Sequence, residues 1–139
     1  MILVIRISGS VEIPAKVEES LYQMRLRRKF AAVLMEENNA TTKLLLKMRN
    51  YVAFGRISEA NIVKLIQIRG QPIKSGDKID ASKVVAQLGK KKLDSMGLKP
   101  FFRLHPPRGG IESKNHFGVG KGVLGDNKED INKLLERML

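Results

Sequence analysis

The first 57 residues alternate between strand-like and helix-like patterns, and this alternation constrains the fold more than any other feature. Strands are predicted where β-branched and apolar residues run together, and helices where apolar residues recur three and four positions apart. The order is strand, helix, strand, helix, strand, over residues 2–8, 15–24, 29–36, 40–49 and 51–57. Short elements in this order predict a small α+β fold, in which two helices cover one face of a three-stranded sheet.

Beyond this predicted core the pattern becomes mainly helical. A helix beginning after Ser58 is expected to end at Gly70, and a shorter helix follows from Asp80 or Ser82. We therefore divide this part of the chain into an α+β core over residues 1–57 and a helical insertion over residues 58–100.

Residues 101–139 combine a short strand, a Pro/Gly loop and a helix. Residues 101–105 are predicted to return to the sheet as an edge strand, whereas residues 106–127 show little periodicity and are expected to become ordered only on binding. Asp126 or Asn127 can cap a final helix, which we expect to pack onto the core. Its apolar residues recur at helical spacing on one face: Ile131, Leu134, Leu135 and Met138.

The chain carries a large positive charge, with 26 Lys and Arg against 14 Asp and Glu and a formal net charge of +12. Self-repulsion of this size favours a polyanionic partner, and nucleic acid is the obvious one. Phe and Tyr make up only 5% of the residues and Trp is absent. We therefore expect contacts with the phosphates and sugars of structured RNA, and not single-stranded bases stacked across a sheet.

The sequence lacks the signals that are typical of membrane, secreted and disulfide-bonded proteins. An apolar run of 18 residues and a lipidation signal are both absent, so no membrane partner is expected. Met1 leads directly into a strand-like run, so we expect no secretory signal peptide. The absence of Cys excludes disulfides and thiolate metal sites, and it fits an intracellular protein.

The segment Phe-Phe-Arg-Leu-His-Pro-Pro-Arg-Gly-Gly, residues 101–110, is a strong candidate for a binding site. Pro106 and Pro107 restrict the backbone, and the two glycines after Arg108 allow close approach to another surface. A guanidinium displayed at such a bend suits bidentate contact with phosphate. Taken alone, the motif is also compatible with an ordinary solvated turn.

Two features suggest enzymatic chemistry, but their context does not support it. Residues 120–125 match G-x-G-x-x-G, yet no convincing strand precedes them, and Lys121 is not followed by the Ser or Thr of a phosphate loop. His105 and His116 are the only histidines, and they lack the spacing of a zinc site or an acid–base pair. We expect no enzymatic activity, cofactor, metal or small-molecule substrate.

Several stretches, in the same order along almost the whole chain, resemble archaeal large-subunit ribosomal proteins of the L-thirty family, whose eukaryotic relative is called L-seven. The resemblance implies a ferredoxin-like core of three antiparallel strands with two helices on one face, and no catalysis. It also implies binding to large-subunit rRNA close to the 5S rRNA, beside neighbouring ribosomal proteins, in the cytoplasm. The matching stretches are Tyr51–Gly55, Arg103–Gly110, His116, Gly118–Gly125 and Glu129–Leu135.

Charge and position together give a set of candidate RNA contacts. Their members are basic residues, a histidine and glycines at strand ends, at helix ends or in rigid loops. Most are expected to meet phosphates and 2′-hydroxyls, which position a protein on RNA without reading its sequence. The candidates are Arg27, Arg28, Lys47, Arg49, Arg56, Arg103, His105, Arg108, Gly109, Gly110 and Lys121.

Two alternative functions remain open at this point. In the first, the apolar stripe of the final helix docks a protein partner, and the chain is a basic adaptor. In the second, the chain is a general RNA chaperone that acts outside the ribosome.

Overall fold

The computed structural model describes residues 1–9, 13–74, 80–87, 97–108, 110, 113–116 and 122–139. β1 (Ile2–Arg6) runs through the middle of the sheet, and all five of its residues are buried. Helices cover both faces of this strand, which is why its first four residues, Ile2–Ile5, form a continuous apolar run and not an alternating pattern. β1 pairs antiparallel with β2 (Ala31–Met35) on one side and with β3 (Val52–Arg56) on the other. The predicted ferredoxin-like α+β core is confirmed.

Three further strands extend the sheet to the order β4-β2-β1-β3-β6-β5. β4 (Phe102–Arg103) pairs antiparallel with β2, as expected for an edge strand in this segment. β6 (Gly122–Asp126) pairs parallel with β3, and β5 (Ser113–His116) pairs parallel with β6. The prediction of a loop throughout residues 106–127 is therefore wrong at these two strands. Their glycines and polar residues give no strand pattern, and main-chain pairing with β3 decides the structure of β6.

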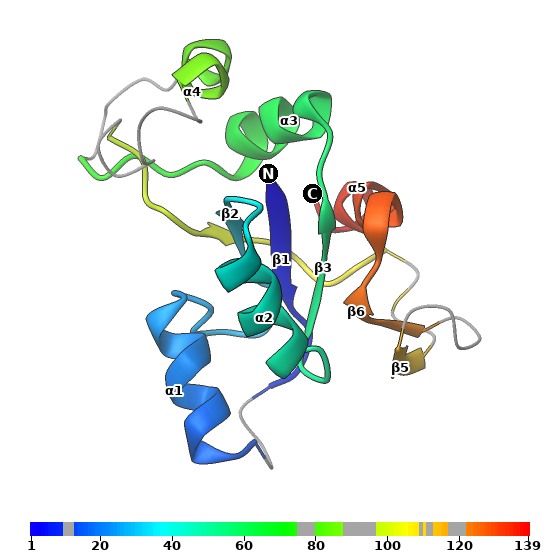
Figure 1. Ribbon diagram of the computed structural model, residues 1–139. Helices are drawn as coiled ribbons and strands as arrows, with labels where there is room; N and C mark the ends of the chain where they lie inside the picture. Colours follow the sequence, from blue (N-terminus) through cyan, green and yellow to red (C-terminus); the bar gives the residue numbers. More distant parts are fainter. Residues whose placement is uncertain (10–12, 75–79, 88–96, 109, 111–112, 117–121) are drawn as a thin grey trace.

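α1 (Ala15–Gln23) and α2 (Asn39–Lys47) cover one face of the sheet, as predicted (Figure 1). Leu21 of α1 and Leu45 of α2 share a core cluster with the residues of β1, β2 and β3 that point to this face. α2 begins after Asn38, whose side-chain Oδ1 accepts a hydrogen bond of 2.8 Å from the Thr41 N–H. Such a cap satisfies one of the free donors of the first helical turn.

The opposite face is covered by α3 (Glu59–Arg69) and α5 (Ile131–Met138), and α4 (Ala81–Gln87) packs on α3 (Figure 1). All four apolar residues of the α5 stripe are buried in the core of this face. The expectation that the last helix packs onto the core is confirmed. The stripe is therefore not available for docking a protein partner.

The start of α5 differs from the expected capping. A 3₁₀ turn, Lys128–Asp130, precedes the helix, and the Asp126 Oδ1 accepts from the Lys128 N–H at 2.9 Å. Asn127 is buried, and its amide donates to the carbonyls of Val123 and Gly125. Asn127 thus stabilises the end of β6 and does not cap the helix.

Gly55 in β3 allows the 3₁₀ turn and α5 to lie close to the sheet. A Cβ at this position would lie 2.2 Å from the Lys128 carbonyl oxygen and 2.9 Å from the Ile131 Cβ. Only a residue without a side chain fits at this contact.

The segment between α3 and β4 leaves the core and returns to it. Residues 71–73 run beside residues 97–99, where the Ile73 N–H donates to the Gly97 carbonyl at 2.9 Å and the Lys99 N–H to the Gln71 carbonyl at 2.8 Å. The division of the chain at residues 57 and 100 stays a prediction.

Within the described residues, none of the helices has the length and apolar character needed to cross a membrane.

Candidate nucleic-acid interface

The loop between α1 and β2 presents three arginines on a backbone that hydrogen bonds hold in place. The Arg25 N–H donates to the Tyr22 carbonyl at 3.0 Å, and the Leu26 N–H donates to the Leu21 carbonyl at 2.9 Å. Arg25 itself has a φ of 66°. These are the features of an α-helix C-terminus that is followed by a residue in the left-handed conformation, where glycine is the usual residue. Because Leu26 is fully buried, Arg25 and Arg27 are held on the surface on either side of it.

Arg6, in the central strand, fixes this loop from beneath. Its side chain is 2% exposed, and its Nη1 donates to the Leu26 carbonyl at 2.7 Å. Its Nε donates to the Ser8 carbonyl at 2.9 Å, and its Nη2 donates to the Gly9 carbonyl at 3.4 Å. Burial lowers the pKa of the Arg6 guanidinium, while the charge of Glu18 raises it. The group keeps its proton at neutral pH, because an arginine has a pKa far above 7.

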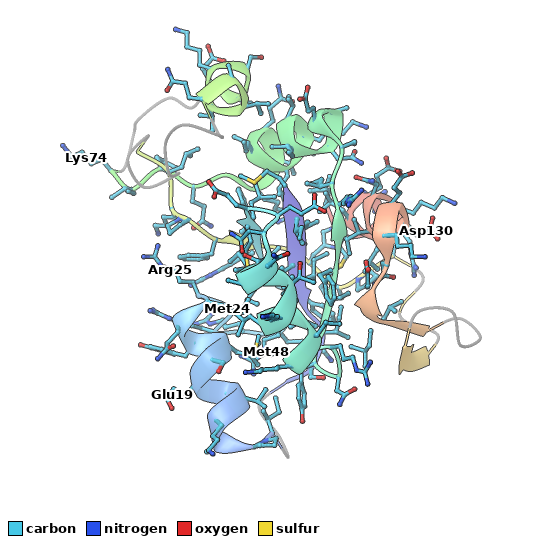
Figure 2. All side chains as sticks on the ribbon, in the orientation of Figure 1. Glu19, Met24, Arg25, Met48, Lys74 and Asp130 are labelled. Carbon is cyan, nitrogen blue, oxygen red and sulfur yellow. The ribbon has the colours of Figure 1, made fainter. Side chains whose placement is uncertain are left out.

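Arg103, in β4, completes the site, which is a hollow of ≈ 450 Å³. We call this site the arginine hollow; Arg25, Arg27, Arg28, Ala31, Phe101 and Arg103 line it. The Arg103 guanidinium lies over the Phe101 ring, 5.6 Å from its centroid, and the Arg27 guanidinium lies 4.2 Å from the centroid of Tyr22. Figure 2 shows Arg25 at the edge of the molecule, beyond the end of α1.

Among the residues that the structure describes, the four arginines of the hollow have no acidic partner. Within the described part of the chain, ion pairs join other residues, and none involves an arginine of the hollow. Four neighbouring positive charges repel one another, so a bound anion lowers the electrostatic energy of the site. The planar donors of arginine match the geometry of phosphate oxygens.

Replacing Arg25 with glycine is expected to make the protein more stable and to weaken its binding to RNA. Glycine adopts the left-handed conformation without the cost of about 1 kcal/mol that a side chain adds there, so the free energy of unfolding should rise by about that amount. Loss of one phosphate contact should reduce the slope of log affinity against log salt by roughly one. Urea unfolding and filter binding measure the two effects.

Arg27→Gly is the matched control for this prediction. It removes the same charge at a position where the backbone is not left-handed, so it should lower the stability through the added freedom of the unfolded chain. Equal stability changes in the two variants would contradict the role given to the left-handed backbone of Arg25.

The Pro-Pro-Arg turn is fixed by the end of α5. The Arg108 N–H donates to the Arg137 carbonyl at 3.0 Å, and the Arg137 Nε donates back to the Arg108 carbonyl at 3.0 Å. The Arg137 Nη2 donates to the carbonyl of Gly110, which has a φ of +73°. The Gly110 N–H closes the turn on the Pro107 carbonyl at 3.0 Å. The exposed Arg108 side chain thus extends from a backbone held on both sides.

His105 lies just before this turn, and both of its ring nitrogens have oxygen neighbours. Its Nε2 lies 2.6 Å from the Leu139 main-chain oxygen, and its Nδ1 lies 2.6 Å from the Pro106 carbonyl oxygen. The half-buried ring therefore joins the segment after β4 to the residue that follows α5. A role of His105 in contacting RNA stays a prediction.

The remaining candidates do not gather at the arginine hollow. Lys47 and Arg49 are exposed at and just after the end of α2. The Arg56 guanidinium pairs with Glu37, with 2.6 Å between Nη2 and Oε1. It lines a second hollow together with Asp126, Glu129 and Asp130. Figure 2 places Asp130 on the side of the molecule opposite Arg25.

Gly109 and Lys121 lie outside the described residues, so their roles also stay predictions. The described residues contain no group of three or more His, Asp or Glu side chains that could hold a metal ion.

Sequence reasoning missed Arg25 and Phe101 as members of the site and Arg6 as its support. The run of basic residues over 25–29 was a visible signal for Arg25. The position of Phe101 beside this run depends on the pairing of β4 with β2, which no local pattern predicts.

Comparison with known proteins finds matches over nearly the whole chain. A family model described as ribosomal protein L30p/L7e matches residues 2–52. The large ribosomal subunit protein uL30 of Desulfurococcus amylolyticus is 35% identical, over 98% of this chain and 96% of that protein. The proteins of the same name from Aeropyrum pernix and Methanococcus vannielii are each 33% identical, over 98% of this chain and 97% of theirs.

Proposed function

The chain belongs to the ribosomal protein L30p/L7e family, and on that premise we propose that its arginine hollow and its Pro-Pro-Arg turn bind rRNA. As a member of this family, it is a structural constituent of the large ribosomal subunit. The observation that carries the assignment of the site is the hollow itself, where four exposed arginines meet that have no acidic partner among the described residues. An RNA backbone supplies the counter-charge that this site lacks.

The proposed contacts position the protein on folded RNA. Guanidinium groups of the hollow and of Arg108 meet phosphates and 2′-hydroxyls, because the deep major groove of A-form RNA is closed to side chains. The turn is already held by α5 before RNA binds, so little ordering of the Arg108 backbone opposes binding. The full set of proposed contacts is Arg25, Arg27, Arg28, Lys47, Arg49, Arg56, Arg103, His105, Arg108, Gly109, Gly110 and Lys121.

The proposal also covers the position of the protein in the ribosome and its lack of enzymatic activity. We extend it to a position close to the 5S rRNA in cytoplasmic ribosomes, which the family resemblance supports. We also propose that the chain has no enzymatic activity, because the glycine motif over residues 120–125 lacks the sequence context of a nucleotide site. Neighbouring ribosomal proteins and rRNA are its partners.

Filter binding of the purified protein to large-subunit rRNA fragments, the 5S rRNA included, tests the proposal across a salt series. We expect saturable, fragment-selective binding that weakens steeply with salt. Arg108→Ala should lower the affinity and reduce the salt slope by roughly one. Lys83→Ala, which removes an exposed charge from α4, should leave the slope almost unchanged. Weak, equal binding to every fragment would contradict the proposal.

A further inference from the structure

We propose that the arginine hollow receives one unpaired nucleotide of the bound RNA, with its base against Phe101 and its phosphate among the arginines of the α1–β2 loop. This inference rests on the proposed function, because it names the part of the RNA that the site would take. It goes further because it proposes a contact with an RNA base, whereas the other proposed contacts are with the phosphates and sugars of the RNA.

The shape and lining of the hollow favour a nucleotide over a duplex backbone. A duplex presents its phosphates and keeps the faces of its bases stacked inside, so an apolar surface beside the arginines would gain no base contact from it. Here the recess has a volume of ≈ 450 Å³, within the roughly 300–1,000 Å³ of sites that hold small ligands. Ala31 and Phe101 give it an apolar wall between the charged groups, and such a wall matches the face of a base.

Phe101 is positioned to stack with a base. The ring is partly buried against the core cluster beneath α1 and α2, and this packing fixes its orientation. The Arg103 guanidinium lies over the ring, 5.6 Å from the ring centroid, and because this side chain is exposed it can move aside for a base. Unstacked RNA bases are commonly held on aromatic rings and on arginine planes, so the base could contact the ring, the guanidinium plane, or both.

The arginines of the α1–β2 loop would hold the phosphate of the same nucleotide. Arg25 and Arg28 line the same hollow as Phe101 and Arg103, and both are exposed. The buried contacts of Leu26 and Arg6 keep the loop backbone in place, so the guanidinium groups need little rearrangement to reach a phosphate. The hollow therefore combines an aromatic ring on which a base can stack with charged groups that can hold its phosphate.

The test compares two substitutions of Phe101 in the full chain, with large-subunit rRNA fragments as the probe. Phe101→Leu keeps an apolar side chain but removes the ring, so affinity should fall roughly 5- to 100-fold. The salt slope should not change, because no charge is lost. Phe101→Tyr keeps the ring and should bind close to wild type. Thermal melting of both variants checks that the fold is intact.

Chemical probing of unpaired bases in the same complexes supplies a second readout. One unpaired base should lose its reactivity when the wild-type protein or Phe101→Tyr binds, and should stay reactive with Phe101→Leu.

The possible outcomes separate this inference from the proposed function. If Phe101→Leu binds as tightly as wild type and protects the same bases, the nucleotide proposal is overturned, while salt-dependent binding by the arginines stands. If the wild-type protein shows no saturable binding to any rRNA fragment, the proposed function and this inference both fall.

Discussion

Replacing the four arginines of the hollow together with glutamine is expected to abolish most of the affinity for rRNA. If each lost charged contact contributes about 1 kcal/mol, the combined loss is on the order of a thousandfold. The slope of log affinity against log salt should fall by roughly three, since each neutralised phosphate contributes about 0.7–0.9. Filter binding across a salt series measures both quantities. The four positions are Arg25, Arg27, Arg28 and Arg103.

A matched variant separates the effect of the site from the effect of total charge. Lys16, Lys64, Lys83 and Lys133 are exposed on α1, α3, α4 and α5, and replacing them with glutamine removes the same four charges. This variant should lose far less affinity than the arginine variant. Equal losses would mean that the net charge alone drives binding and that the hollow is not a site.

Replacing Arg6 with leucine is expected to lower the free energy of unfolding by about 2–4 kcal/mol, one of the largest effects of a single substitution in this chain. The guanidinium donates to three main-chain carbonyls, and leucine would leave the Leu26 carbonyl without its buried donor. Urea unfolding measures the loss. RNA binding should weaken as well, because the α1–β2 loop loses the group that fixes it.

Arg6→Lys and Arg27→Gln are the comparisons for this prediction. Lysine keeps the charge but lacks the planar fork that reaches three carbonyls, so most of the stability loss should remain. Arg27 is exposed, and its replacement should change stability by less than about 0.5 kcal/mol. If Arg6→Leu unfolds at the same urea concentration as wild type, the buried hydrogen bonds do not support the loop.

Local patterns predicted the parts of the fold that local interactions decide. The cap at Ser58 follows from a side-chain acceptor at a helix start, and the apolar stripe of α5 follows from helical spacing. β5 and β6 were missed because their residues carry no strand pattern. β6 is a strand because it pairs with β3, a long-range contact that no local pattern signals.

The candidate site was predicted in part. Charge clustering pointed to Arg27 and Arg28, and the short apolar run before the prolines pointed to Arg103 at the edge of the sheet. The left-handed backbone of Arg25 could not be predicted, because glycine is the residue that signals this conformation. The role of Arg6 in the central strand could not be predicted either, because its acceptors are carbonyls that only the folded chain brings together.

The two walls of the hollow come from distant parts of the chain, and this has a consequence for the order in which the protein matures. The α1–β2 loop belongs to the β1–β2–β3 unit, whose paired strands lie closer together in sequence than β2 and β4 and are therefore expected to form first. The wall that carries Phe101 and Arg103 arrives only when β4 docks on β2 after a long connection. If RNA binds the hollow as proposed, it should bind finished molecules more tightly than partly folded ones that lack Phe101 and Arg103 at the site.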